Sequence, residues 1–256
     1  MDDISRTDSE SNLFFNNLPH GLKVGDGDAE ALLLREYGAV FVARGGAVPP
    51  DRIIFQDGSE VEAFQKSVAS ASDLIGGFEM TLQAAAMEGL RGARSEANAK
   101  GFSITPRGAD SAKRTYEATI ELWASRVEPA LDHWVGNGTL SPETAAEIRS
   151  LPPSEQAPVV LKLETKGIWF AKDLSKSIIY SVAPPGTSQH LAMLAFDVEE
   201  FADAAVRSIL SDYGWHRTVL SDLPHFTFLG IAEPELPTLG LKKTTTQDGD
   251  FWVPDI

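Results

Sequence analysis

Two short segments of the chain alternate polar and apolar side chains with a period of two residues, the spacing of a β-strand with one buried face. In residues 193–198, every even-numbered position is apolar, and the opposite face ends in Asp197. In residues 225–229, His225 lies on the face opposite to two phenylalanines. The pattern therefore predicts two half-buried strands of one sheet that carry Asp197 and His225 on their polar faces.

A second histidine, His190, precedes the first of these strands. It lies seven residues before Asp197, an odd offset that a straight strand would place on the opposite face. The chain must turn near residues 188–190 if both side chains are to reach one ion, and residues 184–186, Pro-Pro-Gly, supply a loop. Two imidazoles and one carboxylate, with one position left for water, are the ligands of a catalytic zinc.

Other residues bear on this predicted site. The chain has no cysteine, so any zinc must be held by histidine or carboxylate side chains. Asp222 lies three residues before His225 and is a candidate base for a metal-bound water, the alternative being a turn carboxylate. His216 is interpreted as a partly buried strand histidine, with a hydrogen bond to the reacting group as the alternative.

Composition limits the partners of the protein. Its 256 residues, 43% of them hydrophobic, are enough for a sizeable core. The formal net charge of -15 argues against an electrostatic grip on nucleic acid or on an anionic membrane surface. No apolar run is long enough to span a membrane. The first residues lack the basic start and apolar core of a secretory signal, so the protein is cytoplasmic or its leader is not part of this chain.

The pattern along the chain predicts an α+β fold with a small antiparallel sheet that carries the metal site on one face and helices on the other. We expect residues 1–30 to be a partly ordered arm, 31–232 a single domain, and 233–256 an irregular tail. The expected helices cover residues 59–75, 78–99, about 111–135 and 198–213. The expected strands cover residues 36–42, 52–55, 159–163, 178–182, 191–198, 215–220 and 226–231.

At its two histidine segments, the sequence resembles the zinc D-alanyl-D-alanine carboxypeptidase and dipeptidase family, which is structurally akin to lysostaphin and the hedgehog signalling domain. The first motif of that family is Ser-x-His, two residues, Gly, one residue, Ala, one residue, Asp. Its second motif is Glu, two residues, His. The positions of this chain that match the first motif are Ser188, His190, Ala195 and Asp197, with Met193 in place of the Gly. In the second motif His225 matches, and Asp222 replaces the Glu.

The resemblance implies that His190, Asp197 and His225 bind zinc and that Asp222 takes the place of the catalytic carboxylate. Asp is shorter than Glu by one methylene, about 1.5 Å, which affects its reach towards a proton. Met193 in place of the Gly suggests that the strand no longer needs close approach by another backbone, or that the substrate is held differently.

The family also has an arginine that binds the terminal carboxylate of the substrate, at the end of a strand that follows a helix. Residues 97–107 resemble this element, which implies that Arg107 is the anchor, with Arg114 as an alternative. The separation between Arg107 and Ser188 is longer than usual for the family. We therefore expect residues 125–178 to be an insertion that forms a lid or one wall of the cleft.

The function implied by the resemblance is hydrolysis of peptidoglycan stem peptides, as a D,D-carboxypeptidase or a D,D-endopeptidase, in the cell envelope or outside the cell. A rival prediction is a non-catalytic zinc-containing domain that binds peptidoglycan or a protein partner. A third is a soluble domain without metal.

Overall fold

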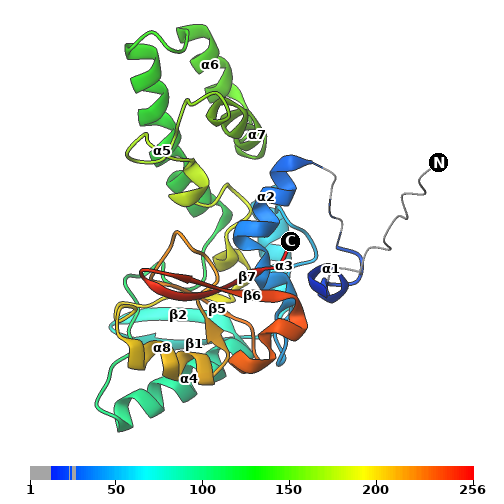
Figure 1. The fold of residues 1–256 in the computed structure, drawn as a ribbon, viewed down its shortest axis with the longest axis vertical. Helices are drawn as coiled ribbons and strands as arrows, with labels where there is room; N and C mark the ends of the chain where they lie inside the picture. Colours follow the sequence, from blue (N-terminus) through cyan, green and yellow to red (C-terminus); the bar gives the residue numbers. More distant parts are fainter. Residues whose placement is uncertain (1–12, 23, 25–26) are drawn as a thin grey trace, which may run out of the picture.

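The computed structural model describes residues 13–22, 24 and 27–256. Helices surround small antiparallel sheets (Figure 1), so the predicted α+β class is confirmed. Of the expected arm, residues 1–12, 23 and 25–26 lie outside the described residues. Helix α1 (Leu13–Asn17) belongs to the folded body, since Phe14 is fully buried in the main hydrophobic cluster. Helix α2 (Asp28–Tyr37) follows it.

The central sheet has the strand order β3-β5-β4, from β3 (Ala195–Asp197), β5 (His225–Phe228) and β4 (Trp215–His216). Both pairs are antiparallel, and Asp197 is directly opposite His225. Side chains that are directly opposite lie on one face of a sheet. The alternation in the sequence thus predicted the facing of both residues correctly, although the strands are shorter than expected.

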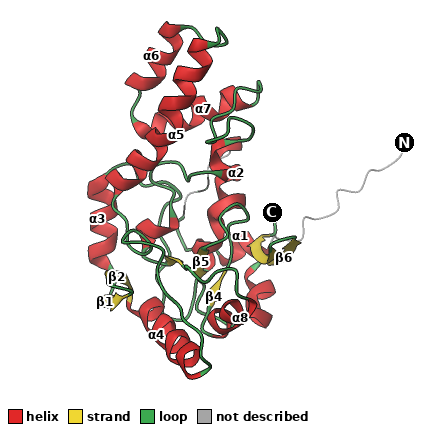
Figure 2. Cartoon of the chain, turned by 90° about the vertical axis from the view of Figure 1, so that its left-hand side faces the viewer, coloured by secondary structure: helices red, strands yellow, loops and turns green. Residues whose placement is uncertain are grey.

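The other face of the central sheet is aromatic. The ring centroids of Phe196 and Trp215 are 6.2 Å apart, and those of Trp215 and Phe228 are 5.3 Å apart. Helix α4 (Ala84–Ala99) packs near this face beside helix α8 (Ala204–Asp212), as Figure 2 shows. The approach is close at Gly89, where a Cβ atom would lie 2.8 Å from the Phe228 ring.

The segment between residues 58 and 83 differs from the prediction. Helix α3 (Gly58–Ser67) ends early, and β1 (Ser70–Ile75) pairs with β2 (Phe78–Gln83) in an antiparallel hairpin. Gly76 and Gly77 have φ values of 59° and 88°, the left-handed conformation that a tight hairpin turn requires. The predicted helices at 59–75 and 78–99 were therefore wrong over the hairpin.

Four predicted strands were also wrong. Residues 36–42 complete α2 and continue as the 3-10 helix η1 (Gly38–Val42), and residues 52–55 form bends. Residues 159–163 belong to helix α7, and the chain at 178–182 begins with the 3-10 helix η2 (Ile178–Tyr180). Each of these segments is rich in apolar residues, and such short runs do not distinguish a strand from a buried helix.

Helices α5 (Tyr116–Gly136), α6 (Pro142–Ser150) and α7 (Pro153–Glu164) project from the rest of the molecule as a helical lobe (Figure 1). The lobe has a hydrophobic cluster of its own, whose buried members lie between Trp123 and Ile179. The long helix expected before Gly136 is present as α5. The segment expected as an insertion at 125–178 lies mostly in this lobe.

The C-terminal residues are not an irregular tail, which corrects the prediction for 233–256. They form the 3-10 helix η4 (Glu233–Leu239) and a hairpin of β6 (Leu241–Thr246) and β7 (Gly249–Pro254). Phe251 on β7 is fully buried, which fixes the hairpin to the body. Among the described helices, none combines the length and the apolar character that a membrane crossing needs.

Candidate metal centre

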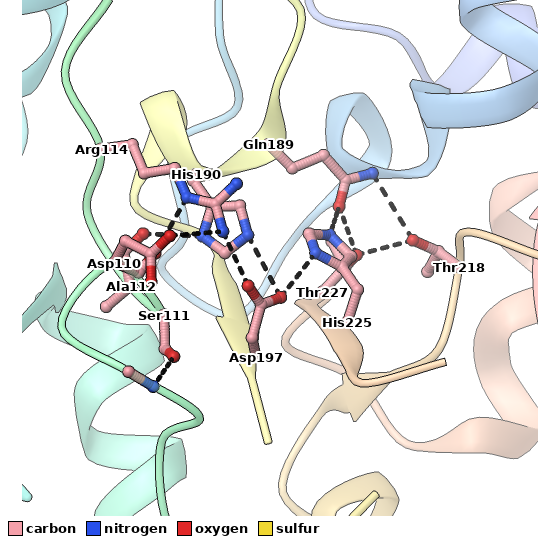
Figure 3. Close-up of polar contacts among 11 residues, drawn as sticks. Asp110, Ser111, Ala112, Arg114, Gln189, His190, Asp197, Thr218, His225 and Thr227 are labelled. Atoms are coloured by element: carbon pink, nitrogen blue, oxygen red, sulfur yellow. Dashed lines mark hydrogen bonds and ion pairs between the residues drawn. The ribbon is translucent and has the colours of Figure 1, made fainter. Parts of the chain in front are cut away.

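The structure brings His190, Asp197 and His225 together (Figure 3). Asp197 Oδ1 lies 3.3 Å from His190 Nε2 and 3.1 Å from His225 Nδ1. The two imidazole rings are nearly perpendicular, at 74°, with centroids 4.9 Å apart. Each of the three residues offers one ligand atom, and these atoms all lie within 4.8 Å of one another. This spacing suits a single metal ion between them.

The backbone before β3 makes this convergence possible. The expected turn near residues 188–190 is a 3-10 helix, η3 (Gln189–Ala192), and it ends at Met193 with φ 55°. Glycine adopts this left-handed conformation more readily than methionine does. The position of Met193 is therefore one at which the backbone turns sharply. The turn brings His190 to the face of β3 that carries Asp197.

The hydrogen bonds of His190 determine which of its nitrogens is free. Burial lowers the pKa of His190, so the ring is neutral near pH 7. Its Nδ1 lies 2.7 Å from the carbonyl oxygen of Ala112, to which only an N–H can donate. Nε2 therefore carries the lone pair, and among the described residues it is a buried nitrogen without a hydrogen-bond partner. That lone pair points at the Asp197 carboxylate.

His225 is oriented by the neighbouring side chain of Gln189. The Gln189 amide donates from Nε2 to the carbonyl oxygen of Tyr37 at 2.8 Å, so its Oε1 is an acceptor. His225 Nε2 lies 2.9 Å from this Oε1 and must donate to it. The hydroxyl of Thr227 donates to the same oxygen. With the proton on Nε2, a neutral His225 ring presents the lone pair of Nδ1 to Asp197 Oδ1, 3.1 Å away.

Three atoms that can each bind a cation thus meet at one point. Burial acts to raise the pKa of the Asp197 carboxyl, but His190 and His225 hold it well below its ordinary value, so the group is ionised. When both rings are neutral, two imidazole lone pairs and a carboxylate oxygen repel one another unless a cation lies between them. The donor set therefore fits a divalent metal ion, with nitrogen and oxygen ligands of the kind that zinc accepts.

Arg114 completes the environment of Asp197. Its Nη2 donates to Asp197 Oδ2 at 2.8 Å, and its Nε donates to the carbonyl oxygen of Asp110 at 2.9 Å. Only 15% of the Arg114 side chain is exposed. The guanidinium therefore holds the oxygen of Asp197 that does not face the histidines, which leaves Oδ1 free for a metal.

The Arg107 side chain does not line the cavity beside this cluster, and its predicted role as the substrate anchor stays a prediction. Its side chain is 52% exposed and lies 3.4 Å from the carboxylate of Glu199. The guanidinium also lies over the Phe201 ring, and Arg107 does not line the cavity beside the metal cluster. Arg114, the alternative from the sequence, is the arginine that the fold brings to the site.

A cavity of about 220 Å³ opens beside the cluster. Two of the three predicted metal ligands, His190 and His225, line this cavity, whereas Asp197 does not. The predicted base, Asp222, lines it as well. Asp222 is exposed, and its backbone carbonyl accepts a hydrogen bond from His225 N at 3.2 Å. Burial, then Glu36 and then Asp222 raise the pKa of Tyr37, another residue of the cavity wall.

Two of the polar residues here were not identified from the sequence. Gln189 lies between Ser188 and His190 of the first motif. A search for residues that could fix the tautomers of the two histidines would have identified it. Arg126 on α5 reaches the cavity from the helical lobe, and no local pattern indicates this. His216 is buried and bonds Ile231 O at 2.9 Å, in agreement with its interpretation as a structural strand histidine.

Comparison with known proteins gives a sparse result. No family profile matches the sequence, and no curated protein matches it. A similar solved structure is that of a mutant of the vancomycin-resistance D,D-pentapeptidase VanY from a VanB-type resistance cassette, in complex with Zn(II). The two chains are 20% identical, the match covers 63% of this chain and 79% of that one, and the TM-score is 0.35. The overall likeness of the two folds is low.

Proposed function

We propose that the protein is a zinc-dependent hydrolase that cleaves peptidoglycan stem peptides, as a D,D-carboxypeptidase or a D,D-endopeptidase. The observation that carries the proposal is the convergence of three possible ligand atoms, on His190, Asp197 and His225, beside a cavity. The resemblance of both sequence motifs supports zinc as the ion and D,D-peptides as the substrates. Such an activity belongs in the cell envelope or outside the cell.

The residues of the site have separate roles in this proposal. His190, Asp197 and His225 would hold the zinc ion, which would supply Lewis-acid polarisation of the scissile carbonyl and would make a bound water more acidic. Asp222, at the edge of the cavity, accepts the proton that the attacking water loses and returns it to the leaving amine. Arg114 holds the Asp197 carboxylate in place through the 2.8 Å hydrogen bond.

Metal content and peptide hydrolysis, measured on the same samples, test this function. We expect the wild type to bind one equivalent of zinc and to release D-Ala from an N-acylated L-Lys-D-Ala-D-Ala peptide. His190→Ala should lose both, because it removes a ligand. Asp222→Asn should retain zinc and lose hydrolysis by about 10²–10⁴-fold, the usual contribution of a general base. His133→Ala, at an exposed histidine of α5, is the matched control and should change neither.

A second candidate is a zinc-containing domain that binds peptidoglycan or a protein partner without cleaving it. The exposed position and the short side chain of Asp222 favour it, since a base must reach within about 3 Å of the proton it takes. Full zinc occupancy with no cleavage of any D,D-peptide would support this candidate against the enzyme. Unchanged zinc content in His190→Ala would contradict both.

A further inference from the structure

Two adjoining cavities, of about 290 Å³ and 330 Å³, are lined by residues of α8 and of the C-terminal hairpin. None of the three predicted metal ligands lines either of them. Three residues line both cavities: Arg207 of α8, Arg217 directly after β4, and Gly249 at the start of β7. Two arginines therefore border the same space, away from the metal centre.

Arg217 is buried, with 5% of the residue exposed, and its bonds are to backbone groups. Nη1 donates to the carbonyl oxygen of Asp248 at 2.9 Å and Nη2 to that of Asp250 at 3.0 Å. The Cζ atom lies 4.2 Å from the centroid of the Phe251 ring. The carboxylate of Asp250 pairs instead with Lys243 at 3.2 Å, and Arg217 forms no ion pair in the described part of the chain. Its charge is thus fixed in place without a carboxylate partner.

Arg207 brings a second positive charge to the same space. Its Nη1 donates to the carbonyl oxygens of Phe201 at 3.0 Å and Ala202 at 2.7 Å, which uses both hydrogens of that nitrogen. Its Nε and Nη2 have no acceptor among the described residues, and Arg207 forms no ion pair with any of them. Burial, and next the charge of Arg207, lower the pKa of Arg217, so the two guanidinium groups are close enough to repel each other.

Gly249 leaves open the space at which the two side chains end. A Cβ atom at this position would lie 2.6 Å from Arg217 Nη2 and 3.9 Å from Arg207 Nη2. Gly249 has a φ of 106°, a conformation that other residues adopt only with strain. The terminal nitrogens of both arginines therefore approach one place, which a glycine keeps free of any side chain. An anion that sits against this glycine can accept hydrogen bonds from both.

The arrangement favours a phosphate group over a carboxylate. Guanidinium groups on two elements can each bind a different oxygen of one tetrahedral phosphate, whereas the two oxygens of a carboxylate are already satisfied by a single arginine. Of the carboxylates that line the cavities, Glu233 and Asp250 both pair with Lys243. Asp250 and Asp248 act to raise the pKa of Arg217, but neither forms an ion pair with it. The protein itself thus leaves the two arginines without a neutralising partner.

We infer that Arg207 and Arg217 form a binding site for a phosphate group, either free or in a phosphate ester, separate from the metal centre. Neither arginine lines the cavity beside the metal cluster. The site therefore does not depend on the proposed hydrolase function, and phosphate and metal occupy different places in the molecule.

Calorimetric titration of the full chain with inorganic phosphate, glycerol 3-phosphate and acetate tests the site. We expect one equivalent of phosphate to bind, and acetate to bind more weakly by about tenfold or more. The tighter of the two phosphate compounds identifies the free ion or the ester as the ligand. Arg207→Gln should weaken phosphate binding by about tenfold or more, the effect of a lost charge-assisted hydrogen bond, and Arg207→Lys should retain part of the affinity. Arg149→Gln is the control, since that guanidinium already pairs with Glu128 at 2.7 Å.

Two further variants make the result decisive. Ser208→Asp changes an exposed residue of α8 that lines one cavity, and its negative charge should weaken phosphate binding without removing an arginine contact. His190→Ala should bind phosphate as the wild type does, because the site holds no metal ligand. Loss of phosphate binding in His190→Ala would place the anion on the metal and overturn the inference. Absence of phosphate binding, equal affinity for acetate, or unchanged affinity in both Arg207→Gln and Ser208→Asp would overturn it as well.

Discussion

Gln189 illustrates how a single residue outside the predicted ligand set determines the chemistry of the candidate site. Its amide joins the body of the protein, through the carbonyl of Tyr37, to the ring of His225. Because the amide oxygen faces His225 Nε2, the imidazole must carry its proton there and present Nδ1 to Asp197. A second layer of this kind sets the tautomer and the orientation of a metal-binding histidine.

We therefore expect Gln189→Met to weaken zinc binding by about 10–100-fold, the usual effect of removing such a support. The substitution keeps the size of the side chain and removes the acceptor for His225 Nε2. Gln156→Met is the control. Gln156 lies in the lobe, where its side-chain oxygen accepts a hydrogen bond from the ring N–H of Trp123 at 3.2 Å, and it is distant in sequence from the predicted metal ligands. Competition with a chromophoric chelator measures both affinities. Equal affinity of the two variants would show that Gln189 has no part in the site.

Among the elements, α4 supports the metal centre from behind the sheet. It lies against the aromatic face of β4 and β5, and glycine at position 89 is what allows the approach. A Cβ there would lie 2.8 Å from both the Phe228 ring and the carbonyl oxygen of Tyr213. The second atom belongs to the backbone and cannot move aside as a flexible side chain can. The sheet that carries Asp197 and His225 therefore depends on this helix contact.

Gly89→Ala should lower the free energy of unfolding by about 1–3 kcal/mol, the cost of overpacking a close contact. Glycine to alanine inside a helix would otherwise be favourable by about 1 kcal/mol. Gly136→Ala at the end of α5 is the matched control, because a Cβ there meets nothing within 4 Å. It should raise the stability by about 0.4–1 kcal/mol. Denaturant titration measures both changes, and a stabilised Gly89→Ala would contradict the close packing.

Prediction of elements from the sequence succeeded where only one period fitted the residues. The 21-residue helix α5 and the facing of β3 and β5 were predicted, since their apolar residues repeat over the whole element. The hairpin of β1 and β2 was missed because Ala71 and Ile75 are four residues apart, a spacing that both a helix and one face of a strand contain. The C-terminal hairpin was missed although Asp248-Gly249 is a turn signal, since nearby prolines favoured an irregular tail.

The candidate site was predictable to the extent that it depends on local pattern. The spacing of His190, Asp197 and His225 led to the cluster that the fold brings together. The sequence did not indicate that Arg126 lines the cavity and Arg107 does not, because the place of an arginine around a cavity depends on how distant segments cross. Arg126 and Ser181 are brought together by the return of the chain from the lobe, which no local period encodes.

At the scale of the whole molecule, α5 is a continuous helix that connects two hydrophobic cores. Tyr116 at its start packs with the cluster around Phe55, whereas Trp123 and later residues belong to the core of the lobe. All three predicted metal ligands lie on elements of the body, and the lobe contributes none of them. It contributes instead to the cavity wall, through Leu122 and Arg126. Metal and substrate should therefore affect different parts of the molecule.

Hydrogen exchange read by mass spectrometry can distinguish these parts. Zinc should slow exchange around η3, β3 and β5, because it joins His190, Asp197 and His225, and should leave α6 and α7 nearly unchanged. A D,D-peptide bound in the cavity should in addition slow exchange in residues 122–126 and 179–183, which contribute to the cavity wall. Equal protection of α6 and α7 by zinc would mean that body and lobe unfold as one cooperative unit, and the separation into two parts would be wrong.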